Sequence, residues 1–482
     1  MSTLAEAPRD QFQTDANRTA TDDVRRLAVR RALSNYQTAR NRTGATFTDW
    51  KSARSAAATI KHEAVNHLDK YLEEFERKFT ARGGKVFWAS NSEQARNYIL
   101  ELAAARGVRS IVKSKAMTGE EIHLNPALLA AGYGVVESDL GEYIQQLKGE
   151  APYHFVFPCM HLRRDEISDL FEKELGTAKT DNPEELTMIA RRVLRRAYID
   201  ADMGISGGNF IVADTGMISI TENEGNARLT VGIPKIHVAL IGIEKVVPCL
   251  GDLALLLPML ATAGTGQHLT GYNSMYGGPR QPGETDGPEE FHVVLLDNHR
   301  TRLLADPEQR DALHCIRCGA CLNVCPIFKN IGGHTYGTTY QGPIGSVITP
   351  HFRGLQDWKH LSGASSLCGA CTETCPVGID IHHHLLRNRR NAAQEKPAPG
   401  ESLVWRMFAF LMRRPALYKF ASRFAPLGSL LHPLIERTAL DPVRAWTNTR
   451  DFPSAPLRSF RAQFKAHQAQ KAAAISQNGG AK

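Results

Sequence analysis

The chain of 482 residues has no hydrophobic run long enough to cross a membrane, and its start lacks the apolar core of a secretory signal. The longest apolar stretch, residues 250–264, contains Asp252 and Pro258 and falls short of the ~18 uncharged residues of a spanning helix. Residues 1–23 are polar and acidic, unlike a signal peptide. We therefore expect a cytoplasmic protein, in which cysteines stay reduced instead of forming disulfides.

Acidic residues are scarce near the end of the chain. Residues 385–482 contain seventeen Lys and Arg but only five Asp and Glu, a net charge of +12, so the first 384 residues carry −4 of the total of +8. Within this region, residues 402–425 repeat apolar side chains at helical spacing with Arg and Lys between them. Such a segment can make a peripheral membrane contact or dock a partner, and an ordinary helix pair packed on the body explains it equally well. No nucleic-acid-binding motif accompanies the charge, so we expect no nucleic-acid partner.

Strand-like and helix-like segments alternate through the first two thirds of the chain. Short apolar strands separated by helices are predicted at residues 84–90, 109–114, 133–138 and 154–158. This alternation predicts a parallel sheet covered on both faces. A β-rich half follows, with strands predicted at residues 209–216, 217–223, 228–234, 235–247 and 291–297. We place an α/β domain at residues 55–300, after a polar and only partly ordered extension at residues 1–54.

Seven of the nine cysteines fall in two short motifs, which favours metal binding over core packing. The first motif has the spacing x2, x2, x3 and a following proline, and consists of Cys315, Cys318, Cys321, Cys325 and Pro326. This run is typical of bacterial iron–sulfur ligation, in which the fourth cysteine ligates the other of two clusters. Zinc sites also use paired cysteines, but rarely four in so compressed a run, so iron–sulfur binding is favoured.

The second motif has one sulfur fewer, because Ser365 stands three residues before Cys368. Exchange of the last thiolate between the motifs predicts a first [4Fe-4S] cluster bound by Cys315, Cys318, Cys321 and Cys375. The second [4Fe-4S] cluster then receives Cys325, Cys368 and Cys371. Its vacant position is compatible with a three-iron cluster, with a cubane that takes serine, water or another residue, or with a cubane open to a partner's ligand. We favour a cubane with a non-cysteine fourth ligand.

Other polar and glycine-rich signals near the motifs are less specific. Cys159 and Cys249 are candidates for a distant fourth ligand, although such cysteines more often pack in a core. The Gly- and Tyr-rich segment 331–350 either approaches a cluster or a partner with its backbone or forms a surface loop. His334 and the histidines of residues 382–384 are expected to pack or face solvent and not to bind metal.

The α/β domain offers weaker signals of a ligand site. Residues 204–210, "GISGGNF", are glycine-rich but lack the spacing of a dinucleotide-binding loop, so a turn is favoured over a phosphate cradle. Glu222 and Glu224 form either a catalytic carboxylate pair or a solvated turn. Lys113 and Lys115 stand at the carboxyl end of a predicted strand, where they either hold an anionic substrate or cover the end of the sheet.

With both motifs placed, the sequence resembles the lactate utilization protein B family over roughly residues 60–430. The resemblance includes "CIRCGACLNVCP", "LCGACTETCP", "GGHTYGTTYQGPIG", "KSKAMTGEEIHLN", "VVESDLGEYIQQL" and "ADTGMISITENEGNAR". Members of this family similarly have three cysteines in the second motif, and the family's ligand assignment is the one given above.

The resemblance implies a lactate-utilization domain similar to sugar-phosphate isomerases and coenzyme A transferases at residues 55–300. It further implies a mainly helical dicluster ferredoxin domain at 301–394, before a basic helical region at 395–464 and a disordered tail at 465–482. The implied partners are a cysteine-rich subunit and a second, smaller lactate-utilization-domain subunit. The implied function is electron transfer in a complex that oxidises L-lactate to pyruvate. The alternative is an enzyme that uses the open iron as a Lewis acid, as dehydratases do.

Overall fold

The computed structural model describes residues 9–397, 400–436, 438, 440–441, 443–447, 450–451 and 453–478. The chain forms two compact units, Met1–Gln394 and Glu395–Lys482. Among the residues described, no helix combines the length and the apolar character needed to cross a membrane.

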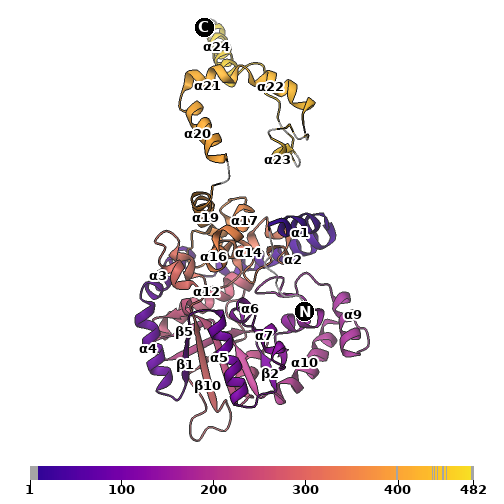
Figure 1. The fold of residues 1–482 in the computed structure, drawn as a ribbon, viewed down its shortest axis with the longest axis vertical. Coiled ribbons are helices and arrows are strands. Elements are labelled where there is room, and N and C mark those ends of the chain that lie inside the picture. The colour runs from indigo at the N-terminus through magenta and orange to yellow at the C-terminus, as the bar shows by residue number, and fades with distance from the viewer. Residues whose placement is uncertain are drawn as a thin grey trace. The chain divides into compact units, whose positions relative to one another are not determined.

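A six-stranded sheet forms the centre of the first unit (Figure 1). Its order is β1-β10-β7-β4-β2-β3, and every pair of neighbours is parallel. The strands are β1 (Lys85–Ala89), β2 (Ser110–Lys113), β3 (Gly134–Glu137), β4 (Met203–Ser206), β7 (Ile236–Gly242) and β10 (Glu290–Leu296). All residues of β4 and β7 are buried, as expected for strands that are covered on both faces.

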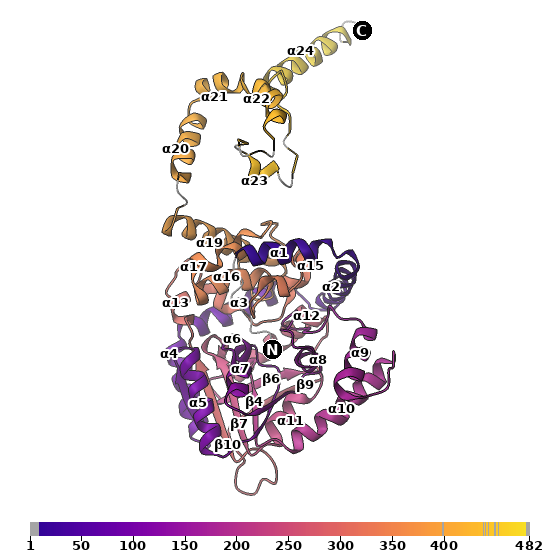
Figure 2. The same cartoon turned by 45° about the vertical axis from the view of Figure 1, so that its right-hand side comes forward.

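Helices cover both faces of this sheet (Figure 2). On one face, Phe79 of α4 packs edge-on against Phe291 of β10, with ring centroids 5.4 Å apart. On the other face, Ile99 of α5 packs in one core with Val238 of β7. Helix α5 begins at Ser92, because the side chain of Asn91 accepts a hydrogen bond from the Gln94 N–H at 3.0 Å. The helices of this domain are α4 (Leu68–Thr80), α5 (Ser92–Ala105), α6 (Met117–Glu121), α7 (Leu124–Ala130), α8 (Leu140–Lys148), α9 (Arg164–Leu175), α10 (Pro183–Ile199), α11 (Asn226–Gly232) and α12 (Leu253–Thr265).

A second, four-stranded sheet has the order β8-β5-β6-β9. Strand β5 pairs antiparallel with β6 and parallel with β8, and β6 pairs antiparallel with β9. Its elements are β5 (Phe210–Val212), β6 (Met217–Glu222), β8 (Val246–Val247) and β9 (Tyr272–Tyr276), with the short 3-10 turns η1 (Ile243–Lys245) and η2 (Leu250–Asp252). Ile218 of β6 shares a core with Phe75 of α4 and Ile241 of β7, so the second sheet covers the same face of the large sheet as α4.

Two predicted strands are wrong. Residues 154–158 form an irregular loop, because Tyr153 and Phe155 are buried in the core of the cysteine region and not in the sheet. Residues 228–234 mostly belong to helix α11, whose first N–H groups are bound by the carboxylate of Glu222. The sheet instead includes β4, whose residues 204–206 belong to the glycine-rich segment predicted as a turn.

The N-terminal extension is more ordered than its polar sequence suggests. Its helices bury Phe12, Val29 and Leu33 in the same core as the cysteine region, which explains their order. They are α1 (Arg9–Thr21), α2 (Asp23–Gly44) and, continuing into the domain, α3 (Trp50–Asn66). Helix α2 contacts α12, α14 and α15, so the extension joins both parts of the unit.

The cysteine region is helical, as predicted. Its elements are α13 (Arg300–Leu304), η3 (Arg310–His314), α14 (Ala320–Val324), α15 (Phe328–Ile331), η4 (His334–Tyr336), α16 (Gly342–Arg353), α17 (Leu355–Gly363), α18 (Ala370–Thr374) and α19 (Ile381–Glu395). It shares its largest core with α2, α3 and α12. The cysteine region and the α/β domain therefore form one compact body.

The second unit is helical, as expected for residues 395–464. It consists of α20 (Glu401–Met412), α21 (Pro415–Ser422), α22 (Ala425–Leu431), η5 (His432–Leu434), α23 (Arg444–Thr447) and α24 (Phe460–Asn478). Within the tail at 465–482 that was expected to be disordered, residues 465–478 continue α24, and residues 479–482 lie outside the described part. The Ala, Gln and Lys residues of this segment are strong helix formers, which outweighs its low complexity.

Candidate metal centres and an adjoining cavity

The two cysteine motifs have the same backbone conformation. Gly319 and Gly369 lie in the left-handed region, with φ of 79° and 82°, and each precedes a helix of five residues, α14 or α18. The residues that end these helices, Cys325 and Cys375, have nearly equal dihedral angles, with φ, ψ of −72°, 119° and −64°, 120°. The repeated spacing in the sequence therefore corresponds to a repeated local structure.

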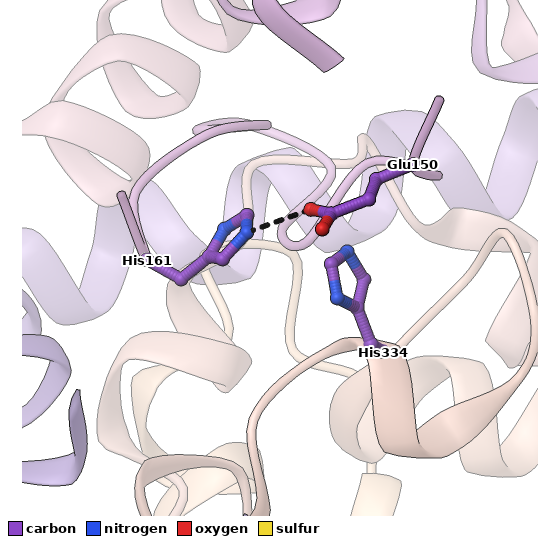
Figure 3. Close-up of side chains that lie close together, drawn as sticks. All are labelled: Glu150, His161 and His334. Carbon is purple, nitrogen blue, oxygen red and sulfur yellow. Dashed lines mark hydrogen bonds and ion pairs between the residues drawn. The ribbon is translucent and has the colours of Figure 1, made fainter. Parts of the chain in front are cut away.

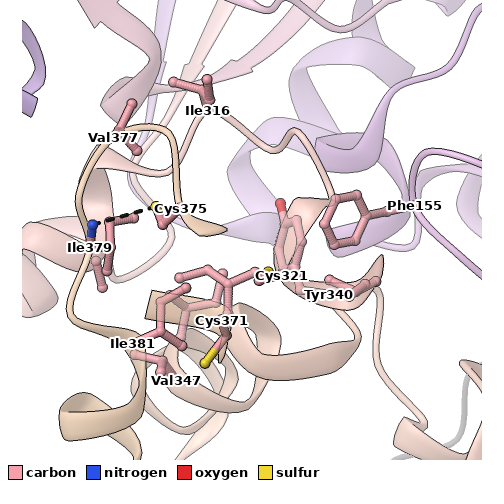
Figure 4. Packing of buried hydrophobic residues seen from close by; sticks show 14 of the residues in the cluster. Phe155, Ile316, Cys321, Tyr340, Val347, Cys371, Cys375, Val377, Ile379 and Ile381 are labelled. Atoms are coloured by element: carbon pink, nitrogen blue, oxygen red, sulfur yellow. Dashed lines mark hydrogen bonds between the residues drawn. The ribbon is translucent and has the colours of Figure 1, made fainter. Parts of the chain in front are cut away.

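The structure brings three cysteines of the first motif together with the last cysteine of the second. A small cavity is lined by Cys315, Cys318, Cys321 and Cys375. Its remaining wall is largely apolar and includes Ile316, Val377, Ile379 and Ile381 (Figure 4). The N–H of Arg317 donates to Cys315 Sγ at 3.4 Å, and the N–H of Ile379 donates to Cys375 Sγ at 3.4 Å. These donors match the backbone hydrogen bonds that stabilise negatively charged sulfur.

The other three cysteines form a separate group. Burial, together with the neighbouring Cys325 and Cys368, raises the pKa of Cys371 to about 12. Burial also raises the pKa of Cys325, with Cys368 adding to the effect. The sulfur atom of Cys371 points away from that of Cys375 (Figure 4). Cys368 is exposed, so the second group lies nearer the surface of its unit than the first.

The chemistry of the first group fits an iron–sulfur cluster. Burial raises the pKa of Cys318 to about 12, and the thiols of Cys375 and Cys315 act in the same direction. Burial and Cys315 similarly raise the pKa of Cys375 to about 11. Several thiolates cannot share a buried apolar space without cations, and iron bound through sulfur supplies the missing positive charge.

Neither remaining cysteine joins these groups. Cys159 packs beside Ile144 and Phe171 in a separate core of the α/β domain. Cys249 lies at the start of η2, where its N–H donates to the carboxylate of Asp252 at 3.0 Å. The structure thus places both residues outside the first cavity and gives neither a contact with the second group.

The segment 331–350 is not a surface loop. Tyr336 and Tyr340 are buried, with 2% and 4% of their surface exposed. A Cβ atom on Gly333 would lie 1.5 Å from the backbone oxygen of Tyr153, so this position requires glycine for close packing. The backbone N–H of Ile344 also reaches the thiol of Cys321 and opposes the effect of burial, which raises the pKa of that thiol. The alternative in which this segment approaches a metal centre is therefore the one that its packing supports.

The histidines take part in hydrogen bonds away from the cysteines. His161 is bonded to Glu150 at 3.1 Å, and the ring of His334 lies beside both residues (Figure 3). His334 Nε2 also pairs with the Ala151 oxygen at 2.7 Å, which ties the loop after α8 to the cysteine region. Lys148 forms an ion pair with Glu150, which disfavours a cation in the middle of this cluster.

Further histidines follow the second motif. His383 pairs with Asp380 at 2.8 Å, and the two lie beside His382. His384 pairs with Asp311 at 2.8 Å. These histidines thus pair with nearby carboxylates, and the expectation that they do not bind metal stays a prediction.

A larger cavity of about 250 Å³ lies at the carboxyl end of the parallel sheet. Residues just beyond three neighbouring strands line it, including Lys115 after β2, Gly207 and Gly208 after β4, and Lys245 after β7. This is the edge at which parallel sheets bind ligands. Cys318 lines both this cavity and the small cavity of the first cysteine group.

Among the residues singled out in the sequence, Lys115, Glu222 and Glu224 line this cavity and Lys113 does not. Lys113 is fully buried in ion pairs with Glu137 at 2.8 Å and Glu120 at 3.3 Å. Burial alone would lower the pKa of Lys113, but these carboxylates outweigh it and raise the pKa above its ordinary value. Lys113 is therefore a structural cation and Lys115 remains a candidate for contact with a ligand.

Sequence analysis missed two cations of this cavity, Arg317 and Lys245. Arg317 pairs with Glu244 at 3.3 Å, and its guanidinium lies over the ring of Tyr340 at 4.3 Å. Burial lowers the pKa of Lys245 to about 8, and the adjacent Arg317 acts in the same direction. The sequence did offer a reason to consider both residues, because Arg317 stands within the first cysteine motif and Lys245 follows a strand.

Comparisons with known proteins agree with this arrangement. Residues 72–296 match the LUD domain, residues 311–379 the 4Fe-4S dicluster domain, and residues 383–469 the family described as lactate utilisation protein B, C-terminal. The 4Fe-4S dicluster domain and the buried thiols together assign iron–sulfur binding to the cysteine region.

Full-length relatives were also found. Lactate utilization protein B of Shouchella clausii is 41% identical over 471 residues, which is 96% of this chain and 98% of that protein. The protein of the same name from Bacillus velezensis is 42% identical over 457 residues, 93% of this chain and 95% of that protein. A crystal structure of a duf162 family protein from Deinococcus radiodurans superposes on 48% of this chain and 98% of its own, with 13% identity and a TM-score of 0.27. The identity and coverage of the full-length relatives show that this chain belongs to the lactate utilization protein B family and has an iron–sulfur role in lactate utilisation.

Proposed function

We propose that the chain is the electron-transfer subunit of a complex that oxidises L-lactate to pyruvate and so allows growth on lactate. The names of the full-length relatives support lactate as the substrate of the system. The observation that carries the electron-transfer role is the presence of two separate cysteine groups within one compact body.

The ligand assignment is part of this proposal. The first [4Fe-4S] cluster takes Cys315, Cys318, Cys321 and Cys375, and the second takes Cys325, Cys368 and Cys371. The common cavity of the first four residues supports their assignment, and the mutual proximity of the other three supports theirs. Each motif then contributes its last thiolate to the cluster of the other, which holds α14 and α18 together.

Two clusters suit the stoichiometry of the reaction. Oxidation of lactate to pyruvate releases two electrons, and an iron–sulfur cluster carries one electron at a time. The chain's own residues hold the thiolates, exclude water with the apolar wall around Cys321, and donate backbone N–H groups to sulfur. The proposed partners are a cysteine-rich subunit and a second lactate-utilization-domain subunit of the same system.

Anaerobic purification followed by iron and sulfide analysis and electron paramagnetic resonance tests the cofactor assignment. We expect about eight irons and two distinguishable signals after reduction. A redox titration with L-lactate and both partner subunits tests the function, because the clusters should become reduced as lactate is consumed. Clusters that keep one oxidation state during turnover would contradict electron transfer.

The same titration addresses a second candidate, in which the iron with no fourth cysteine binds substrate as a Lewis acid. The exposure of Cys368 and the serine at position 365 favour this candidate. It predicts activity without any change in cluster oxidation state.

A further inference from the structure

The cavity at the carboxyl end of the sheet adjoins the first cysteine group and has a volume of about 250 Å³. This volume lies below the ~300–1,000 Å³ of sites for drug-sized ligands, so it suits a small metabolite. Cys318 forms part of its wall, so a molecule in the cavity lies next to the thiolates of the first group.

The carboxylates that line the cavity already have partners. Asp139 pairs with Lys115 at 3.2 Å. Glu222 accepts hydrogen bonds from the N–H groups of Ala227 and Arg228. Its neighbour Glu224 accepts one from the N–H of Asn223 at 3.0 Å.

Glu244, the remaining lining carboxylate, is shared by two arginines. It pairs with Arg300 and, through its other oxygen, with Arg317 at 3.3 Å. All four carboxylates that line the cavity therefore already have hydrogen-bond or ion-pair partners within the protein.

Two cationic groups that line the cavity are not satisfied in this way. The side chain of Arg317 is only 8% exposed, and its Nη1 atom is buried without a hydrogen-bond partner in the described chain. Glu244 and the ring of Tyr340 hold this guanidinium in place. The side chain of Lys245 makes no hydrogen bond or ion pair with any residue that the structure describes. The thiol group of Cys315, when ionised, favours the charged form of both groups. The buried Nη1 atom of Arg317 still has no hydrogen-bond acceptor in the described chain, so the pair can bind a further anion from the cavity.

The cavity also distinguishes between kinds of anion. Gly207 and Gly208 lead into strand β5 and not into a helix, so they do not form a glycine loop that presents a helix N-terminus to phosphate. Helix α11 begins at the cavity, but the carboxylate of Glu222 already accepts hydrogen bonds from its first N–H groups. The unpartnered Nη1 group of Arg317 and the ammonium of Lys245 can each donate to one oxygen of a carboxylate. Asn209 lines the same cavity, and because its side-chain oxygen is used by the Thr221 N–H, its NH2 group remains to donate to a hydroxyl or keto oxygen.

We propose that this cavity binds a small 2-hydroxy or 2-keto carboxylate, with Arg317 and Lys245 as the residues that hold its carboxylate. The identification of this anion as lactate or pyruvate rests on the function proposed above, whereas the anion site rests on the unpartnered cations. The site places substrate or product beside the first cluster of this subunit.

Calorimetric titration of the anaerobically purified full chain with L-lactate and with pyruvate tests the site. The variant Lys245→Met removes one cation, and Lys235→Met is its control, because Lys235 is an exposed lysine at the opposite end of β7. We expect Lys245→Met to weaken binding by roughly tenfold or more, Lys245→Arg to restore most of it, and Lys235→Met to leave it unchanged. Iron content and both paramagnetic signals should be the same in all four proteins.

Several results would overturn the inference. One is that neither L-lactate nor pyruvate binds to the wild-type chain. Another is that Lys245→Met binds them as tightly as the wild-type chain does. A third is that inorganic phosphate competes for the site as well as the carboxylates do. Loss of iron in Lys245→Met would also overturn it, since the lysine would then serve the cluster and not a ligand. If partner subunits transfer electrons from lactate but no lactate binds here, this site fails and the proposed function stands. If lactate binds here but the clusters are never reduced, the proposed function fails and the site stands.

Discussion

Ser365 occupies the position in the second motif that Cys315 occupies in the first. The N–H of Leu367 donates to Ser365 Oγ at 3.1 Å, just as the N–H of Arg317 donates to Cys315 Sγ at 3.4 Å. Leu367 and Arg317 also share a positive φ, 55° and 60°. The backbone that presents a cysteine to the first group therefore presents a serine to the second.

This equivalence predicts that Ser365→Cys adds a thiolate to the second cluster. We expect the variant to retain its irons longer in air and to change the paramagnetic signal of one cluster only, because a fourth thiolate replaces a weaker ligand. Ser366→Cys is the control, since it adds an exposed thiol one position away. The same behaviour in both variants would show that position 365 does not face the cluster.

Exchange of thiolates between the motifs predicts which signal each cysteine controls. Cys375→Ser should remove the signal of the first cluster, as Cys318→Ser should, although Cys375 belongs to the second motif. Cys371→Ser should instead affect the second cluster, and each variant should lose up to about four irons. Cys159→Ser, which lies in another core, should change neither signal. Paramagnetic resonance and iron analysis check this, and loss of one signal from both Cys375→Ser and Cys371→Ser would refute the exchange.

Arg300 should be essential for stability. Its guanidinium donates to both carboxylate oxygens of Glu121 at 2.9 and 2.8 Å and also pairs with Glu244, and all three side chains are at most 5% exposed. Arg300→Met leaves two carboxylates buried without this partner, so we expect a loss of about 3–5 kcal/mol in the free energy of unfolding. Denaturant titration measures this loss. Arg302→Met, an exposed position on the same helix, should cost less than about 0.5 kcal/mol.

The ion pairs of Glu290 should make stability depend on pH. The hydrogen bond from Arg106, with a further contribution from Lys85, lowers the pKa of Glu290 from 4.5 to about 2. Because the folded value is below the unfolded value, the stabilisation is complete well above pH 4.5 and is lost as the pH falls toward 2.

We therefore expect Glu290→Gln to lower the stability at pH 7 by about 1 kcal/mol, the size typical of partly exposed ion pairs. The difference from wild type should shrink as the pH is lowered from 4.5 toward 2. Thermal unfolding followed by circular dichroism from pH 7 to pH 3 measures it, with the exposed neighbour Glu289→Gln as control. A difference that stays constant over this range would assign the effect of the substitution to packing.

Much of the fold was predictable, because apolar strands that alternate with helices indicate a parallel sheet even when the order of the strands in the sheet is unknown. The errors have identifiable causes. Residues 154–158 have the composition of a strand, but Tyr153 and Phe155 are buried against the cysteine region. Residues 228–234 look like a strand, but the carboxylate of Glu222 caps a helix there. In both places a contact outside the segment outweighs its local preference.

The sequence by itself determined the two cysteine motifs and their shared local structure, because the spacing between ligands is covalent and the glycines allow the required turns. It also marked Lys115 and Glu222 as polar residues near the end of a sheet. The spacing also predicted that Cys375 joins the first motif, and the cavity that the four cysteines share agrees with it. Only the tertiary structure decided that Arg317 and Lys245 meet in one cavity and that Cys318 meets them there. Those meetings depend on how the α/β domain and the cysteine region pack, and packing follows from the sum of many weak contacts far apart in the chain.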